Sequence, residues 1–292
     1  MPKNFSAQQL VGVANQIRIN TLKMLGAAGS GHTGGPLGIA DVLAALYFSV
    51  MNVDPVHPRD PYRDRFVLSA AHMVPVLYAT LIERGFISQS ELLTLRKNDS
   101  RLKGHTFRDL DIGVETTGGS LGQGIGIAVG MALAGKLHAT MGRPTKKKSK
   151  PDELVDYRVY CVIGDGESNE GSVWEAAMLA AKYSLDNLCV VCDRNHIQLS
   201  ETSDVIMPLD PVVDKWKAFN WNVIEVDGND IPQVLFAFSK AKMVSGKPSI
   251  IIANTVPGKG VSFMENKWEW HGKVPDKKQL DIALAELTAN QS

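Results

Sequence analysis

The sequence predicts an α/β protein with a mostly parallel sheet and helices on both faces. Short apolar runs alternate along the chain with longer segments of helical periodicity, which is typical of parallel strands joined by crossover helices. The chain has 292 residues, of which 44% are apolar and 21% charged, as in an ordinary globular protein with a sizeable core. Neither an internal repeat nor an obvious linker divides it, so we expect a single domain spanning residues 1–292.

The predicted elements follow one another in the order expected for such a sheet. The first helix should cover residues 6–25, where apolar residues recur every three or four positions before Gly26. Further helices are expected at residues 40–51, 73–84, 122–141, 171–184, 231–243 and 276–287. Strands are expected at residues 66–68, 159–163, 188–192, 223–226 and 249–252. Ligands of open parallel sheets bind beyond the carboxyl ends of strands, so the loops there are the candidate site.

The net charge and the cysteines indicate which binding partners and which cellular compartment to expect. The formal net charge is zero, so neither nucleic acid nor an anionic membrane is an expected partner, and lysines 146–148 are interpreted as a surface loop. No apolar run is long enough for a membrane span and no signal-peptide core is present, so we expect a cytoplasmic protein. Cys189 and Cys192 form a C-x-x-C within a predicted strand, where they point to opposite faces. Two buried side chains are therefore expected, not a redox pair.

Polar residues follow two successive strands. Asp165 lies between two glycines directly after one strand, and Asn195 follows the next. Each alone is common as a helix cap or turn residue, but together they can supply a carboxylate and an amide oxygen at one edge of the sheet. With a nearby backbone carbonyl, these make three oxygen ligands, which suits magnesium completed by phosphate and water. The flanking glycines and the following helix N-terminus favour a diphosphate.

The motifs around these residues resemble one family. GDG followed by Asn after the next strand is similar to the metal and diphosphate motif of enzymes that use thiamine diphosphate. The order and spacing of SGHTGGPLG, LSAAHMVP, LKGHT, TGGSLGQG, YRVYCVIGDGESNEGSVWEA and EWHG resemble transketolases, from about Leu10 to about Gly272. The chain looks like the N-terminal subunit of a two-gene transketolase, and this resemblance implies the thiamine-diphosphate-binding fold.

The resemblance implies a set of cofactor and metal contacts. The metal, Mg²⁺ or Ca²⁺, would be bound by the side chains of Asp165 and Asn195 and by the carbonyl of Ile197. The cofactor would be contacted by His72, Gly119, Leu121, Gly166, Asn195 and His271. Glu170 matches an acid of the family's carboxylate network between subunits, and we include it with the cofactor residues.

Three histidines are expected to act on the sugar. By the same resemblance, His32, His105 and His271 contact sugar hydroxyls and transfer protons beside the cofactor. Imidazole is suited to this work because its pKa lies near neutral pH. For each histidine the alternative is a hydrogen-bonded structural residue. His57 and His138 match no motif and are expected at the surface.

The resemblance also implies a partner. In this family a glutamate on a second domain activates the cofactor, and that domain has no counterpart in this sequence. We therefore expect a C-terminal transketolase subunit that carries the glutamate, two copies of each chain in the assembly, and sugar phosphates as substrates. The alternatives are the alpha subunit of a 2-oxo acid dehydrogenase, a deoxyxylulose phosphate synthase, or a non-catalytic module that binds a metal and a diphosphate.

Overall fold

The structure, a computed structural model, describes residues 5–140 and 157–289. The lysines at 146–148 and the side chain of His138 lie outside the described parts. The α-helices are α1 (Ala7–Ala28), α2 (Gly34–Gly38), α3 (Ala40–Ala45), α4 (Val74–Arg84), α5 (Gln123–Thr140), α6 (Gly171–Lys182), α7 (Ser203–Ile206), α8 (Val212–Ala218), α9 (Ile231–Met243) and α10 (Lys277–Ala289). The strands are β1 (Arg65–Leu68), β2 (Val159–Gly164), β3 (Leu188–Arg194), β4 (Ile197–Gln198), β5 (Glu201–Thr202), β6 (Asn222–Asp227) and β7 (Ser249–Asn254).

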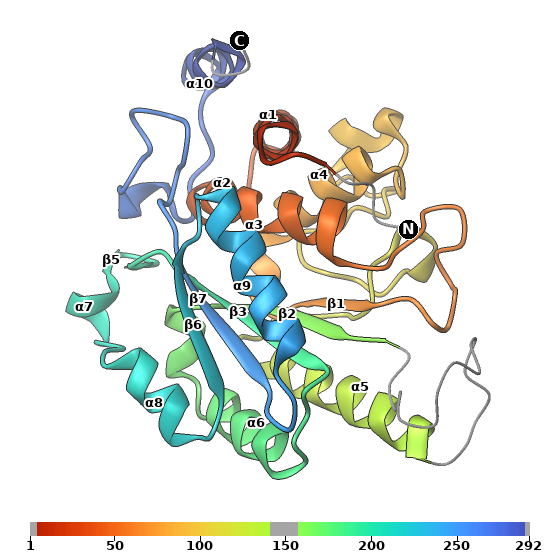
Figure 1. The fold of residues 1–292 in the computed structure, drawn as a ribbon. Coiled ribbons are helices and arrows are strands. Elements are labelled where there is room, and N and C mark those ends of the chain that lie inside the picture. Colours follow the sequence, from red (N-terminus) through yellow and green to blue (C-terminus); the bar gives the residue numbers. More distant parts are fainter. Residues whose placement is uncertain (1–4, 141–156, 290–292) are drawn as a thin grey trace.

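Five strands form one parallel sheet in the order β1-β2-β3-β7-β6. Helices α1, α3, α4 and α9 cover one face, and α5, α6 and α8 cover the other (Figure 1). The predicted fold class is therefore confirmed. No helix in the parts of the chain that the structure describes combines the length and apolar character of a membrane span.

Side chains alternate between two apolar cores, one on each side of the sheet. On β2, Tyr160 and Val162 belong to the core under α1, α3, α4 and α9, whereas Cys161 belongs to the core under α5 and α6. On β3, Cys189 faces the first core and Cys192 the second, and both are free and buried. The expectation of two buried cysteines on opposite faces is confirmed.

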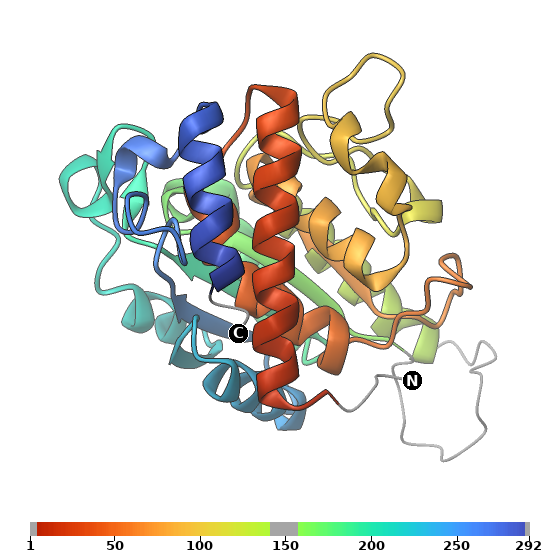
Figure 2. The ribbon, with the colours of Figure 1, turned by 90° about the horizontal axis from the view of Figure 1, so that it is seen from above.

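The first helix does not stop where it was expected to. It continues through Gly26 to Ala28 and ends at Gly29, whose φ of 66° places it in the left-handed region. A Cβ on Gly26 would lie 2.5 Å from a methyl carbon of Leu280 on α10. Gly26 therefore serves helix packing and not helix termination. Figure 2 shows α10 beside α1, where the Asn15 side chain donates to the carbonyl of Leu287 at 2.6 Å.

Two stretches differ further from the expectation. The helix expected at 40–51 is present without a break over residues 40–50, but its last part, Leu46–Val50, is π-helical, and the short helix α2 precedes it. Between β3 and β6, the hairpin β4–β5 and the helices α7 and α8 were not predicted. These elements have two to seven residues, too few to produce a recognisable hydrophobic period. The hairpin matters for function because it follows Asn195 directly.

Candidate functional site

A cavity of about 330 Å³ opens beyond the carboxyl ends of β2 and β3. β2 and β3 are neighbours in the sheet, so the loops that follow them emerge side by side. Eight predicted site residues line this cavity: His72, Leu121, Asp165, Gly166, Glu170, Asn195, Ile197 and His271. The predicted metal residues thus face the same space as two of the histidines.

Asp165 is held tightly at the base of this cavity and is only 2% exposed. Its Oδ1 accepts a hydrogen bond from the N–H of Gly166 at 2.7 Å. Its Oδ2 accepts from the N–H of His196 at 2.9 Å, from the Ser203 hydroxyl at 3.0 Å and from the Arg194 guanidinium at 3.3 Å. Burial raises the pKa of Asp165, and Ser203 and Arg194 partly oppose that rise. The carboxylate is therefore fixed in position.

The Asn195 amide is also oriented by its neighbours. Its Oδ1 accepts from the N–H of Ile197 at 3.1 Å, and its Nδ2 donates to Asp193 at 2.8 Å. Asp193 is fully buried and accepts a second hydrogen bond from Thr255, and burial raises its pKa to about 7. Among the residues that the structure describes, no group of three or more His, Cys, Asp and Glu could hold a metal. A cation bound by Asp165, Asn195 and a carbonyl would therefore need further oxygens from a ligand.

Glu167 joins three loops around the cavity. Its carboxylate accepts from the Ser69 hydroxyl at 2.5 Å, from the N–H of Gly122 at 2.7 Å and from the N–H of Gly164 at 3.1 Å. Ser69 follows β1, Gly122 precedes α5 and Gly164 ends β2. The buried carboxylate of Glu167 therefore connects all three segments. Burial raises its pKa. No local pattern in the sequence indicated this role, because two of the partners are distant along the chain.

Three histidines form a cluster, and two of them, His72 and His271, line the cavity. The ring centroids of His32 and His72 are 4.9 Å apart, and each ring lies 5.5 Å from that of His271. Burial, with smaller contributions from neighbouring positive groups, lowers the pKa of His32 to about 4 and that of His72 to about 3; burial also lowers the pKa of His271. The cluster is therefore neutral at pH 7. The Nδ1 atoms of His32 and His271 are buried with no hydrogen-bond partner among the described residues.

Three of the predicted residues do not line the cavity. His32 reaches it only through its contacts with His72 and His271. His105 is exposed and lies in a separate hollow of about 370 Å³ with Arg96, Lys97 and Lys103. It nevertheless makes a small electrostatic contribution to the lowered pKa values of His32 and His72, so it is close to the cluster. Gly119 is exposed, and a Cβ there would meet no atom within 4 Å.

The hairpin after Asn195 contributes residues that sequence reasoning missed. Gln198 and Leu199 of the hairpin line the cavity, as does Met207 just after α7. The Nε2 of Gln198 is buried with no partner in the described chain, and a Cβ on Gly166 would lie 3.0 Å from the Gln198 Cγ. Leu199 and Met207 are exposed at the rim. Their spacing followed neither a helical nor a strand period, which is why the sequence did not indicate them.

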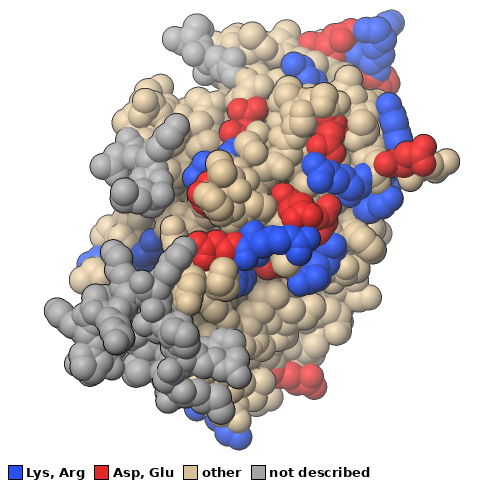
Figure 3. Space-filling model, turned by 90° about the vertical axis from the view of Figure 1, so that its right-hand side faces the viewer, with Lys and Arg blue, Asp and Glu red and all other residues tan. Residues whose placement is uncertain are grey.

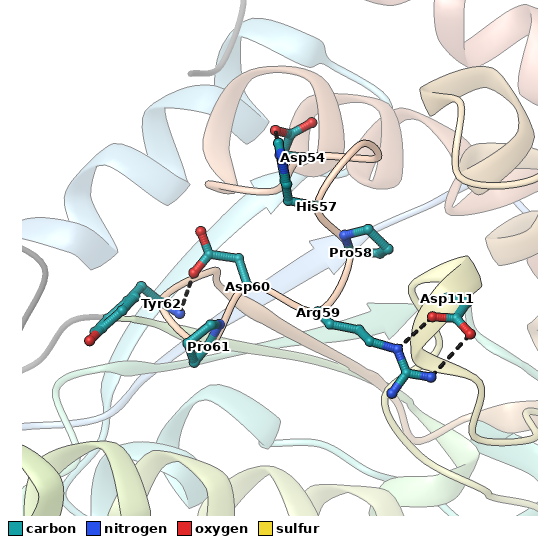
Figure 4. A pocket seen from close by; sticks show the side chains of 8 residues that line it. All are labelled: Asp54, His57, Pro58, Arg59, Asp60, Pro61, Tyr62 and Asp111. Carbon is teal, nitrogen blue, oxygen red and sulfur yellow. Dashed lines mark hydrogen bonds and ion pairs between the residues drawn. The ribbon is translucent and has the colours of Figure 1, made fainter.

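A larger hollow on another face has no comparable arrangement. Its polar side chains interact with one another. The Arg59 guanidinium donates to the two carboxylate oxygens of Asp111 at 2.5 and 3.0 Å, and the Nδ1 of His57 is 3.0 Å from the Asp54 carboxylate (Figure 4). His57 is exposed, as expected. Acidic and basic side chains are intermixed over the surface in Figure 3 and leave no continuous basic patch among the described residues there. We therefore place the functional site at the cavity beyond β2 and β3.

Comparison with known proteins identifies the family. Residues 10–288 match the family model described as "Transketolase, thiamine diphosphate binding domain". The chain is 43% identical to a 6-deoxy-6-sulfo-D-fructose transketolase subunit from Clostridium sp., and the match covers 94% of each chain. It is 40% identical to one of the subunits of apulose-4-phosphate transketolase from Phocaeicola vulgatus, over 89% of this chain and 87% of that one.

Longer transketolases match over part of their length. The transketolase of Homo sapiens is 38% identical over 98% of this chain, which corresponds to 43% of the human protein. The crystal structure of transketolase from Campylobacter jejuni superposes with a TM-score of 0.84 at 30% identity, over 98% of this chain and 43% of that chain. The expectation of a transketolase is thus confirmed. The chain belongs to the transketolase family and corresponds to its N-terminal, thiamine-diphosphate-binding part.

Proposed function

We propose that this chain is the N-terminal subunit of a split transketolase. With a partner subunit, it would transfer a two-carbon ketol unit reversibly from a ketose phosphate to an aldose phosphate. The observation that carries this proposal is the cavity in which Asp165 and Asn195 lie together with histidines of a neutral cluster. Residues 1–292 would form one domain, and the three buried free cysteines are consistent with a cytoplasmic location.

The cavity suits a metal-bound diphosphate. Asp165, Asn195 and the carbonyl of Ile197 would hold a divalent cation, and their oxygen atoms favour Mg²⁺. Gly166 leaves the adjoining wall open, and its N–H, which donates to Asp165, would be shared with the diphosphate. Gln198 and His271 offer buried polar atoms that have no partners among the described residues. These are the features expected of a wall that a polar ligand completes.

The histidines would handle protons during ketol transfer. Thiamine diphosphate, when bound, supplies the carbanion and the electron sink for carbon–carbon bond cleavage. The chain supplies proton donors and acceptors at the sugar oxygens. Burial lowers the pKa of His32 and of His271, and their Nδ1 atoms have no partner among the described residues, so each would be a neutral imidazole able to accept a proton. His105, beside Arg96 and Lys103, would contact the sugar at the entrance.

A partner subunit would supply the missing catalytic part. In the resemblance to transketolases, a glutamate on a second domain activates the cofactor. The chain covers 43% of the Campylobacter jejuni transketolase chain, and both relatives of similar length are named as subunits. We propose an assembly with two copies of each chain. Those relatives are named for a sulfonated and a phosphorylated sugar, so the substrates proposed here also carry a terminal anion.

The experiment is reconstitution with the complementary C-terminal subunit. Ketol transfer should be absent or weak for this chain alone and should appear when the complementary subunit, Mg²⁺ and thiamine diphosphate are added together. Strong activity of the chain free of any partner would contradict the proposal. If the chain bound thiamine diphosphate and the complementary subunit but the complex transferred no ketol unit, the non-catalytic module would be the better interpretation.

A further inference from the structure

Two segments that are distant along the chain bring His32 and His271 together. We call residues 31–35 the His32 segment and residues 268–274 the His271 segment. The two ring centroids are 5.5 Å apart and the ring planes are 89° apart, which is an edge-to-face arrangement. A Cβ on Gly272 would lie 4.0 Å from the Cδ2 and Nε2 atoms of His32, so the backbone after His271 packs against the His32 ring. The spacing of the rings therefore depends on how the two segments are joined.

The residues on the two sides of His271 are held differently. Trp270, directly before it, is 6% exposed and belongs to an apolar cluster that includes Leu37 of α2. A Cβ on Gly34, at the start of α2, would lie 3.3 Å from the carbonyl oxygen of Trp270, so this glycine permits the close approach. On the other side, Lys273 is exposed, and its ammonium lies 4.6 Å from the centre of the Trp270 ring. Side-chain burial thus fixes the residue before His271 but not Lys273.

A threonine hydroxyl holds the exposed side. The Thr33 hydroxyl donates to the backbone carbonyl of Lys273 at 2.6 Å, across 240 positions of the sequence. Thr33 follows His32 directly and is fully buried. Within the described chain, this is the one hydrogen bond between the His32 segment and the His271 segment.

The imidazoles are not fixed through their Nδ1 atoms. Those of His32 and His271 are buried without a hydrogen-bond partner in the part of the chain that the structure describes. The position of each ring therefore depends on its packing and on the backbone that carries it. The hydrogen bond from Thr33 acts on both backbones, because it begins one residue after His32 and ends two residues after His271.

We propose that Thr33 is a positioning residue for ketol transfer, whose hydroxyl holds the His271 segment against the His32 segment and so sets the spacing of the two imidazoles. This inference rests on the proposed function, in which these histidines transfer protons. Thr33 acts through them and not on the substrate. Because a displacement of about 1 Å can lower the rate of a reaction about 100-fold, one hydrogen bond that fixes this spacing matters for turnover.

Thr80 offers a matched control for a purely structural role. It is also fully buried, and its hydroxyl donates to a backbone carbonyl, that of Val76 within α4, at 2.7 Å. Thr80 does not line the cavity. Thr33→Val and Thr80→Val each remove one such hydrogen bond and keep a branched side chain, so both should lower the melting temperature by a similar few degrees. Thr33→Ser keeps the hydroxyl and should behave as wild type.

The first measurement is the NMR signals of the histidine rings in the isolated chain. With ¹³C-labelled histidine, the signals of His32 and His271 are assigned from His32→Gln and His271→Gln. Two rings that meet edge to face shift each other's signals, so Thr33→Val should move both signals. Thr80→Val should leave both in place, and Thr33→Ser should restore the wild-type positions.

The second measurement is turnover of the complex with the complementary subunit, Mg²⁺ and thiamine diphosphate. Thr33→Val should lower kcat about 10- to 100-fold. Cofactor affinity should stay close to that of wild type, because the proposed metal ligands Asp165 and Asn195 are oriented by other contacts. Thr80→Val should keep wild-type kcat.

Two results would overturn the inference. One is Thr33→Val with the ring signals and kcat of Thr80→Val. The other is an equal loss of kcat in Thr33→Ser and Thr33→Val, which would assign the effect to packing of the methyl group and not to the hydroxyl. If the wild-type complex transferred no ketol unit, the proposed function itself would fail. The ring signals of the isolated chain would then still decide whether Thr33 positions the histidines.

Discussion

The carboxylate of Asp165 accepts a hydrogen bond from the backbone N–H of His196 at 2.9 Å, which joins the loop after β2 to the loop after β3. The same oxygen accepts from Arg194, whose side chain is buried. The other acidic partners of Arg194, Asp204 and Asp210, are exposed. Asp165 therefore stabilises the fold as well as offering a metal ligand.

We expect Asp165→Asn and Asp165→Ala to differ. Both should weaken binding of Mg²⁺ and thiamine diphosphate by at least about tenfold, because the only carboxylate among the three proposed metal ligands is lost. Asp165→Ala should also lower the free energy of unfolding by about 1–3 kcal/mol, since the His196 N–H and the Ser203 hydroxyl lose an acceptor that asparagine still offers. Calorimetry and urea unfolding test the two effects separately. Asp210→Asn, which removes an exposed partner of the same Arg194, is the control, and cofactor binding by Asp165→Asn at wild-type strength would refute the metal assignment.

His32→Ala and His105→Ala should keep cofactor affinity and lose turnover in the complex with the partner subunit. A positioned acid–base group contributes on the order of 100- to 10,000-fold to rate. His57→Ala, at an exposed histidine away from the cavity, should leave turnover unchanged. Cofactor titration combined with steady-state kinetics separates binding from turnover. Weak cofactor binding with normal turnover at saturation would instead place these histidines at the diphosphate.

Gly166→Ala should weaken cofactor binding by about tenfold. The new methyl group would lie 3.0 Å from the Gln198 Cγ and on the wall where the diphosphate is expected, so the hairpin must move. Gly171→Ala is a close control, because a Cβ at this exposed glycine meets no atom within 4 Å. Titration of each variant with thiamine diphosphate and Mg²⁺ gives the comparison. Equal affinities for the two variants would show that Gly166 is not near the ligand.

The histidine cluster should make the fold sensitive to mild acid. The folded-state pKa of His32 is lowered from 6.5 to about 4, so below pH 6.5 the unfolded chain binds more protons than the folded chain. Stability should therefore fall as the pH decreases from about 6.5 to about 4. Urea midpoints over this range should fall less steeply for His32→Gln than for wild type. Parallel pH profiles for the two proteins would exclude a contribution from His32.

Features set by local order along the chain were predictable. The sheet and most helix bounds follow from alternating apolar runs, and Cys189 and Cys192 were assigned to opposite faces from their spacing alone. Asp165 and Asn195 were paired because parallel strands end at one edge. Gly26 was misinterpreted because a glycine that ends a helix and one that admits a neighbouring helix look alike without Leu280 beside it.

Features set by contacts between distant segments were not predictable. Glu167 gains its role from Ser69 and Gly122, which are 98 and 45 positions away. Gln198 faces the cavity only because the short hairpin folds back over Gly166. His105 was grouped with His32 by motif, yet the structure places it in a separate exposed hollow. Motif spacing indicates which residues belong to a site but not which wall each one occupies.

The rate at which the buried cysteines react with a thiol reagent should report on unfolding of this protein. Cys161, Cys189 and Cys192 are fully inaccessible, and burial raises the pKa of the Cys189 thiol to about 12, so almost no reactive thiolate exists at neutral pH. Because the three thiols lie on strands at the centre of the sheet, a soluble alkylating reagent can reach them only when the strands separate. Labelling kinetics should therefore track the rate or population of unfolding, and occupancy of the cavity by cofactor should appear as protection of all three together.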